Sequence, residues 1–214
     1  TLSEVEDLAH SATRAGVTLF ASWHSRFAAG VEPARAWLAD KHISDIAIEW
    51  KEDVRQWHPG QDWIWQPGGL GVFDPGINAL SILTRLLPGP VRLEEAQLEF
   101  PENREAPIAA ALAMRSTAGA PISAAFDWRQ TGRQSWNIEV TTDAGMPLLA
   151  DGGNTLLIDG AAQTLPCEAE YPSLYAHFAR LIRERRSDVD VSPLRLVADA
   201  FLTGRRSSTD AFHD

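Results

Sequence analysis

Cysteine is nearly absent from this sequence of 214 residues, which contains only Cys167. A single cysteine cannot form an internal disulfide, so the chain must be stabilised by its apolar core, and a cytoplasmic location is expected. Long apolar runs are also missing, because none approaches the roughly 20 residues that a membrane-spanning helix needs. We therefore expect no membrane partner.

Basic residues are in the minority. The sequence has 19 Lys and Arg against 29 Asp and Glu, and its formal net charge is -10. An acidic surface repels the phosphates of nucleic acids and of anionic membranes, so neither is expected as a partner. Because 44% of the residues are hydrophobic, the chain has enough apolar side chains for one large domain, or for one domain with a remnant of another.

Several signatures of catalytic and cofactor sites are absent as well. No group of cysteines and histidines has the spacing of a metal site, so no metal is predicted. No serine stands in a nucleophile elbow. The glycine cluster Gly68-Gly-Leu-Gly71 lacks the spacing of a dinucleotide phosphate loop, and no clear strand leads directly into it. The cofactor-binding residues therefore stay unassigned.

The first 30 residues have the pattern of half a βαβ repeat. Residues 2–14 predict an amphipathic helix, with Ser3 as its N-cap and Gly16 just past its end. Residues 17–23 are apolar and predict a buried strand. A lone half-repeat has no partner in a parallel sheet, so we expect that further sequence precedes Thr1 in the intact protein.

Residues 31–214 predict one larger unit. Turn-forming residues separate short β-prone segments between residues 91 and 165, a pattern typical of an antiparallel meander with one face covered. Helices are expected around this sheet, and a loop over residues 57–72. The sequence therefore predicts an α+β fold with an open, mainly antiparallel sheet and helices on one face, preceded by a βα remnant. The expected helices span residues 31–40, 74–87, 173–186 and 194–206, and a further strand spans residues 43–50.

A carboxylate and an amide share one face of the expected helix at residues 74–87. Asp74 and Asn78 are four residues apart, and Pro75 occupies the first helical position if Asp74 is the N-cap. Capping alone explains Asp74 but not Asn78, which is a modest helix former one turn into an apolar helix. The pair therefore has two interpretations, a helix cap or a polyol-binding site whose carboxylate transfers a proton.

Other polar and aromatic residues gather in the same stretch of sequence. His24 ends the expected buried strand, where ligands bind in open α/β sheets, although a structural hydrogen bond explains it equally well. Glu52 and His58 flank the expected loop and could also be solvated surface residues. Nearby tryptophans are core residues or platforms for the apolar faces of sugars. They are Trp23, Trp57, Trp63 and Trp65.

Long motifs in these regions resemble the L-arabinose and D-galactose 1-dehydrogenases of the Gfo/Idh/MocA oxidoreductase family. The resemblance implies that residues 1–30 are the end of a dinucleotide-binding Rossmann domain. Residues 31–214 would then form a domain for substrate binding and oligomerisation. The motifs are WHPGQDWIW at residues 57–65, GGLGVFDPGINALSI at 68–82, LFASWHSR at 19–26, YPSLYAHF at 171–178 and DVDVSPLRLVADAF at 188–201.

The sequence departs from the family pattern at one position. The family has two glycines, an Asp, and a His four residues later, whereas this chain has Gly68-Gly69, Asp74 and then Asn78. Asn cannot exchange a proton, so proton transfer falls to Asp74 or to the lysine of the family's Glu-Lys-Pro motif. That motif is expected upstream of Thr1, since neither Lys41 nor Lys51 stands in one.

The resemblance implies an enzyme that oxidises the anomeric carbon of an aldopyranose to the aldonolactone and passes hydride to NAD or NADP. Asp74 and Asn78 would be the catalytic residues, and the cofactor would be held mainly outside this chain, so the chain alone is expected to be inactive. A non-catalytic sugar-binding or assembly module is the alternative, and another aldose or an inositol is the alternative substrate. The residues implied to bind the sugar are His24, Glu52, Trp57, His58 and Trp136.

A homodimer or homotetramer through the open sheet is also expected. Ile108, Leu112 and Met114 lie on one alternation of their segment, and small residues such as Ala111 and Ala113 lie on the other. Two apolar faces indicate that both are covered, the second by another subunit or by the chain's own terminal helices.

Overall fold

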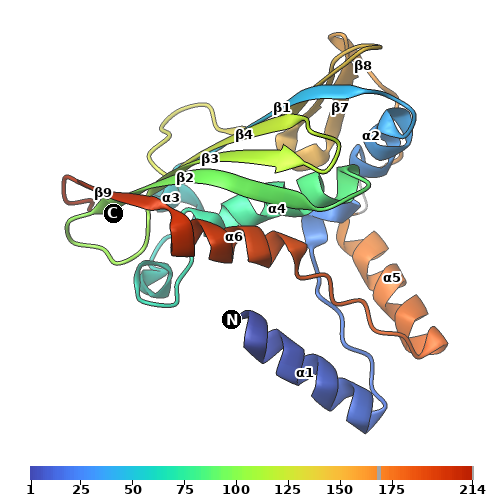
Figure 1. The fold of residues 1–214 in the computed structure, drawn as a ribbon, viewed down its shortest axis with the longest axis horizontal. Helices are drawn as coiled ribbons and strands as arrows, with labels where there is room; N and C mark the ends of the chain where they lie inside the picture. Colours follow the sequence, from blue (N-terminus) through green and yellow to red (C-terminus); the bar gives the residue numbers. More distant parts are fainter. Residues whose placement is uncertain (168–169, 214) are drawn as a thin grey trace.

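The computed structural model describes residues 1–167 and 170–213, and its centre is a nine-stranded sheet. Neighbouring strands follow the order β8-β7-β6-β5-β1-β4-β3-β2-β9 (Figure 1). The β1–β4 and β2–β9 pairs are parallel and the other pairs are antiparallel, so the predicted open, mainly antiparallel sheet is confirmed. The strands are β1 (Ile43–Lys51), β2 (Val91–Pro101), β3 (Ala109–Ser116), β4 (Pro121–Asp127), β5 (Ser135–Thr142), β6 (Pro147–Ala150), β7 (Thr155–Ile158), β8 (Ala161–Ala162) and β9 (Arg205–Thr209).

Helices lie against one face of the sheet in Figure 1, where α4 packs against the central strands β1 and β5 and α6 packs against β2 nearer the edge. The predicted helices all form, within a few residues of the expected bounds. The expected loop over residues 57–72 is irregular apart from its first residue and one 3-10 turn. The α-helices are α1 (Leu2–Ala15), α2 (Val31–Leu38), α3 (Val54–Trp57), α4 (Phe73–Leu86), α5 (Glu170–Glu184) and α6 (Ser192–Thr203), and the 3-10 helices are η1 (His24–Phe27), η2 (Asp62–Trp65) and η3 (Asp151–Gly153). None of the helices in the described residues is long and apolar enough to cross a membrane.

Alternating side chains of the central strands make the core under α4. Ile48 of β1 and Phe126 of β4 are buried on the helix side, as is Leu80 of α4. Gly76 brings the first turns of α4 especially close to β4, because a Cβ atom there would lie 3.3 Å from the Phe126 ring. The N-terminal end of α4 is therefore held directly against the sheet by packing.

The glycine before α4 is also required by its surroundings. Gly71 has a φ of 54°, and a Cβ atom at this position would lie 2.4 Å from the carbonyl oxygen of Pro107. Only glycine avoids both the left-handed strain and this clash with backbone. The chain therefore enters α4 along one path, which determines where the first helical side chains point.

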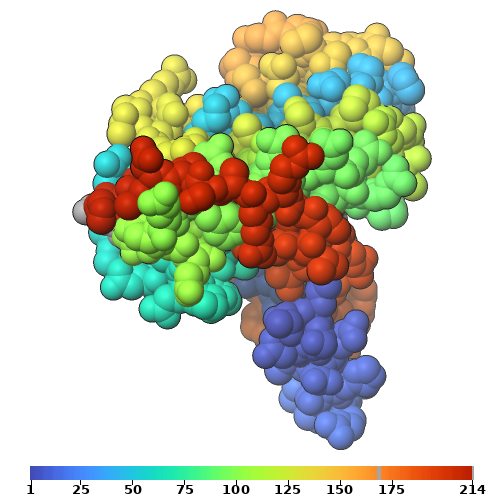
Figure 2. Space-filling model, turned by 60° about the vertical axis from the view of Figure 1, so that its left-hand side comes forward, coloured from blue at the N-terminus to red at the C-terminus, as the bar shows by residue number. Residues whose placement is uncertain are grey.

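The expected strand at residues 17–23 does not form. Leu19 and Ala21 exchange backbone hydrogen bonds with Asp188 in an isolated bridge centred on Phe20, and the Leu19 N–H also donates to the Ser187 hydroxyl. Val17 is 59% exposed. An apolar segment becomes a strand only where another strand runs alongside it, and a single bridging residue is too short a partner. The helix half of the predicted βα unit is present as α1, which projects from the body of the molecule (Figure 2).

The prediction for the start of α1 is wrong, and the prediction for its end is confirmed. Thr1, and not Ser3, is the N-cap, and it forms a capping box with Glu4. Gly16 adopts a left-handed conformation with a φ of 65° and ends the helix as predicted.

The outer face of the sheet is open to solvent in this chain. Ala111 and Ala113 are exposed, whereas Ala110 and Leu112, which alternate with them, are buried on the helix side. The helix α6 packs against β2 on the buried side. The terminal helices therefore do not cover the small residues of the outer face.

Candidate active site

Asp74 lies in the first turn of α4 but does not cap the helix. The N-cap is Val72, and the Asp74 backbone N–H donates to the carbonyl oxygen of Gly71 over 2.8 Å. Within the described residues, the Asp74 carboxylate has one ion-pair contact, with His58. The interpretation of Asp74 as a cap is wrong because the helix begins earlier than its sequence pattern indicates, and its carboxylate is left to face a cavity.

The cavity beside Asp74 has a volume of about 380 Å³. Asn78 lines it one turn further along α4, and its side-chain amide makes no hydrogen bond to any other described residue. All the predicted site residues except Trp136 line this space, although they come from separate parts of the chain. The lining residues are His24, Glu52, Trp57, His58, Asp74, Pro75 and Asn78.

Glu52 follows β1 directly and forms the buried floor of the cavity. Its residue is only 4% exposed, and its carboxylate accepts from two indole N–H groups, those of Trp128 at 3.3 Å and Trp136 at 2.9 Å. The Glu52 backbone N–H donates to Asp127 over 2.9 Å, so β4 holds it in place. Most of its hydrogen-bonding capacity is therefore used inside the protein.

His58 connects Glu52 to Asp74. Its Nε2 lies 3.2 Å from Glu52 Oε1, and its Nδ1 lies 3.6 Å from Asp74 Oδ2. Burial disfavours the imidazolium, but the hydrogen bond and negative charge of Glu52, with the charge of Asp74, outweigh it and raise the His58 pKa. Burial also raises the pKa of Asp74. The negative charge of Glu52 raises it further, and the positive charge of His58 lowers it without cancelling the increase. Both groups therefore bind a proton more tightly than they would free in water.

His24 approaches the cavity from the opposite side, on η1. The residue does not end a strand as expected, because it opens this 3-10 helix. Its Nδ1 is hydrogen-bonded to Glu170, and its ring stacks on Tyr171 with centroids 5.5 Å apart and planes 9° from parallel. Glu170 and Tyr171 were not predicted as site residues, since nothing in their spacing relates them to His24.

Two tryptophans form the aromatic side of the site. Trp57 is 46% exposed beside the cavity and meets Trp136 edge to face, with ring centroids 5.2 Å apart. Trp136 lies behind Trp57 and is held through its indole N–H by Glu52. An exposed aromatic face next to polar groups suits the apolar face of a sugar ring. Trp65, in contrast, is buried in the core.

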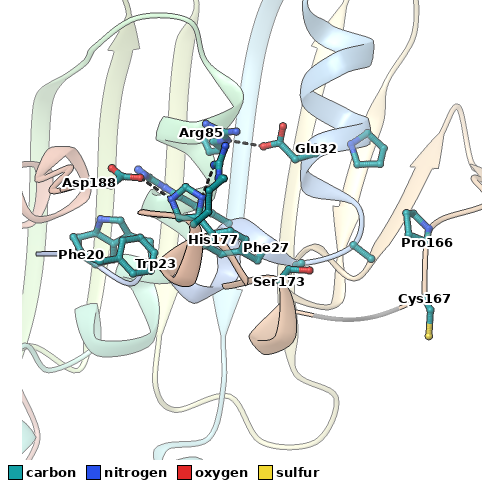
Figure 3. A pocket seen from close by; sticks show the side chains of 16 residues that line it. Phe20, Trp23, Phe27, Glu32, Arg85, Pro166, Cys167, Ser173, His177 and Asp188 are labelled. Carbon is teal, nitrogen blue, oxygen red and sulfur yellow. Dashed lines mark hydrogen bonds and ion pairs between the residues drawn. The ribbon is translucent and has the colours of Figure 1, made fainter. Parts of the chain in front are cut away.

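A larger cavity, of about 520 Å³, lies on the other side of η1 and is drawn in Figure 3. Phe20, Trp23 and Phe27 line it. Its charged side chains pair with each other, as Glu32 does with Arg85 over 2.5 Å and His177 does with Asp188 over 3.1 Å. The smaller cavity is the better candidate site because the Asn78 side chain there makes no hydrogen bond to another described residue and the Asp74 carboxylate is 3.6 Å from its nearest charged neighbour, His58.

The part of the chain that the structure describes contains no cluster of metal-ligating side chains. No group of three or more His, Cys, Asp or Glu side chains there is placed to hold a metal ion. The polar groups of the cavity are instead two carboxylates, an amide and two imidazoles, which are able to bind hydroxyl groups and move protons.

Comparison with known proteins identifies the family. No family model matches the sequence. The chain is 50% identical over 188 residues to a galactose 1-dehydrogenase from Pseudomonas fluorescens. The aligned residues cover 88% of this chain and 62% of that protein. It is 60% identical to D-galactose 1-dehydrogenase from Rhizobium etli in a crystal structure, with a TM-score of 0.96 over all of this chain and 68% of that one. The chain belongs to the Gfo/Idh/MocA family of oxidoreductases.

A solved structure with much lower sequence identity has the same fold. A 3-ketoreductase from Actinomadura kijaniata, in complex with NADP and TDP-benzene, has a TM-score of 0.81 at 15% identity. The alignment covers 97% of this chain and 69% of that protein. This chain thus spans about three-fifths of the curated relative from Pseudomonas fluorescens and two-thirds of the solved proteins, and it corresponds to the C-terminal part of the family fold.

Proposed function

We propose that this chain is the substrate-binding part of an aldose 1-dehydrogenase that oxidises the anomeric carbon of D-galactose or L-arabinose to the aldonolactone. The observation that carries the proposal is the convergence of Asp74, Asn78, His24 and His58 on one cavity beside Trp57. The high identity to two galactose 1-dehydrogenases supports the same reaction class.

NAD or NADP is the proposed cofactor, and the complex of the 3-ketoreductase with NADP supports a nicotinamide. When bound, the nicotinamide accepts a hydride from the anomeric carbon. The side chains of the cavity fit the reacting end of such a reaction, because they bind a sugar hydroxyl and take its proton. The glycine pattern of this chain does not fit the dinucleotide phosphates. We therefore propose that the chain alone neither oxidises sugar nor quenches its tryptophan fluorescence on addition of NADP.

Asp74 is proposed as the catalytic base. Its carboxylate accepts the proton of the anomeric hydroxyl while the C–H bond of that carbon breaks and the carbonyl of the lactone forms. Asn78 hydrogen-bonds the same oxygen and orients it, which an amide does without gaining or losing a proton. Asp74, whose side chain is 28% exposed, then releases the proton to solvent, and the charge of His58, 3.6 Å away, tunes the proton affinity of its carboxylate.

The remaining predicted residues are proposed to hold the sugar. His24 binds a hydroxyl, and Trp57 packs against the apolar face of the ring with Trp136 behind it. Glu52 supports the sugar site from below by holding His58 and Trp136 in place. Preorganised groups of this kind lower the entropic barrier of the reaction.

The domain limits and partners are part of the same proposal. Residues 1–30 complete a Rossmann domain and residues 31–214 bind the substrate, in a cytoplasmic homodimer or homotetramer. The open outer face of the sheet, with Ala111 and Ala113 exposed, supports assembly through the sheet. The acidic net charge of -10 argues against nucleic acid as a partner.

Turnover by the full-length protein tests the proposal. NADH or NADPH formation is measured by absorbance with D-galactose, L-arabinose, other aldoses and myo-inositol. We expect turnover with D-galactose or L-arabinose and its loss in Asp74→Asn. Sugar binding without turnover, with either cofactor, would favour the alternative of a non-catalytic sugar-binding module. The absence of both sugar binding and turnover would contradict the proposal.

A further inference from the structure

The first turn of α5 reaches the edge of the sugar cavity. Glu170, the first residue of this helix, is hydrogen-bonded to Nδ1 of His24, from which it is separated by 146 residues along the sequence. Its side chain is 16% exposed, while that of His24 is 36% exposed and lines the cavity. Glu170 thus contacts His24 without itself lining the cavity.

The partner at Nδ1 determines what His24 offers at its other nitrogen. A carboxylate only accepts hydrogen bonds, so Nδ1 carries the proton and donates it to Glu170. In a neutral imidazole Nε2 is then an acceptor. Stacking on Tyr171 holds the ring plane in the same orientation. The ring is therefore set to accept a hydrogen bond from a hydroxyl group.

The backbone that carries His24 is fixed separately. Arg26 on η1 donates to the Ser81 carbonyl and to Thr84 Oγ1, both at 2.8 Å and both on α4. It also pairs with Asp190 before α6. These contacts hold η1 against α4, so loss of Glu170 releases the His24 ring and leaves the backbone beneath it in place.

We propose that Glu170 is a positioning residue for sugar binding, which fixes the tautomer and rotation of His24 so that Nε2 accepts a hydrogen bond from one sugar hydroxyl. This inference rests on the proposed function. It makes the cavity selective for a polyol with a donating hydroxyl at the His24 end. A deoxy sugar that lacks this hydroxyl gains nothing from Glu170.

Steady-state kinetics of the full-length protein test the role. In Glu170→Ala we expect the KM for the accepted aldose to rise about 10-fold, as for loss of a charge-assisted hydrogen bond. We expect kcat, the KM for the cofactor and the melting temperature to stay close to wild type. Glu170→Gln keeps an acceptor without the charge, so it should show a smaller increase in KM. The control is Glu184→Ala at the other end of α5, where the carboxylate pairs with Arg186 at the surface.

A double-mutant cycle separates positioning from general stability. If Glu170 acts through His24, then Glu170→Ala adds no further increase in KM to a His24→Ala protein. The monodeoxy sugar that loses affinity for wild type should then bind wild type and Glu170→Ala equally. Additive effects in the cycle, or an unchanged KM in Glu170→Ala, would overturn the inference while leaving the sugar dehydrogenase intact. A wild-type protein without activity on any aldose would instead reject the proposed function itself.

Discussion

His58 and Asp74 face each other across the cavity with Nδ1 and Oδ2 3.6 Å apart, and the other ring nitrogen of His58 contacts the buried Glu52. The three residues form a line of acid and base groups that ends at the cavity. The distance exceeds that of a hydrogen bond, so the Asp74 carboxylate is free to contact a ligand. In the proposed mechanism Asp74 exchanges the proton that the family histidine at position 78 would exchange, because Asn78 has no titratable group.

Substitution of Asp74 tests its catalytic role. Asp74→Ala in the full-length protein should lower kcat by about 100-fold or more, the range for loss of a general base, with a much smaller effect on KM. The melting temperature should stay near that of wild type, since Asp74 makes no capping hydrogen bond. Kinetics and thermal unfolding measure both effects. Near-normal kcat with a lower melting temperature would show a purely structural residue.

The pH profile tests the coupling between Asp74 and His58. Burial raises the Asp74 pKa and the positive charge of His58 opposes that increase. If the base form of Asp74 is the active one, as proposed, the acid limb of kcat/KM should lie at higher pH than it would for an unperturbed Asp. His58→Gln removes the opposing charge, raises the Asp74 pKa further and should move the acid limb to higher pH. A shift to lower pH, or no shift, would contradict the coupling.

The control for this pH experiment is His42→Gln. His42 is exposed in the loop before β1 and does not line the site cavity. Its substitution should leave the acid limb where wild type has it.

The pKa of Asp190 is shifted downward, whereas that of Asp74 is shifted upward, so Asp190 should stabilise the fold at neutral pH and lose this contribution in acid. Burial alone would raise its pKa, but hydrogen bonds from Ser192 and Arg26 lower it below the ordinary value. Its folded pKa is below the unfolded one, so its contribution is present above the unfolded pKa and is lost as pH falls through the folded pKa. Asp190→Asn should therefore destabilise the protein by about 1–2 kcal/mol at pH 7. The difference should shrink below pH 3.8, the ordinary value.

Thermal or urea unfolding at several pH values measures this difference. Asp7→Asn is the matched control, because Asp7 is exposed on α1 and makes no side-chain contact with the other described residues. An equal loss of stability at neutral and acid pH would show that packing, and not charge, explains the role of Asp190.

A charge on the outer face of the sheet tests the proposed assembly. Ala111 of β3 is exposed beside Ala125 of β4 and opposite Gln97 of β2, so a partner could approach the backbone closely. Ala111→Asp should dissociate the full-length dimer or tetramer, as measured by light scattering or sedimentation. Ala118→Asp, in the turn between β3 and β4, should leave the assembly intact. An intact oligomer in Ala111→Asp would place the interface elsewhere.

Local patterns were enough to predict most elements of this fold. The period-two alternation of β1 and β3 and the apolar stripe of α4 each specify which side faces the core. Gly16 ends α1 because a left-handed residue is needed there. The four-residue spacing of Asp74 and Asn78 put both on one helical face, and both line the cavity. These features depend on neighbours within a few residues, which is why they can be predicted from the order of side chains alone.

Relationships between distant segments were decided only by the tertiary structure. Residues 17–23 have the composition of a strand, yet they form none because, among the described residues, their pairing with another segment is a single bridge between Phe20 and Asp188. Asp74 looks like a cap until the path through Gly71 starts α4 earlier, at Phe73. Glu170 reaches His24 across 146 residues. The local sequence determines the secondary structure, whereas the packing of remote segments determines which polar side chains come into contact. The candidate site consists of such contacts between remote segments.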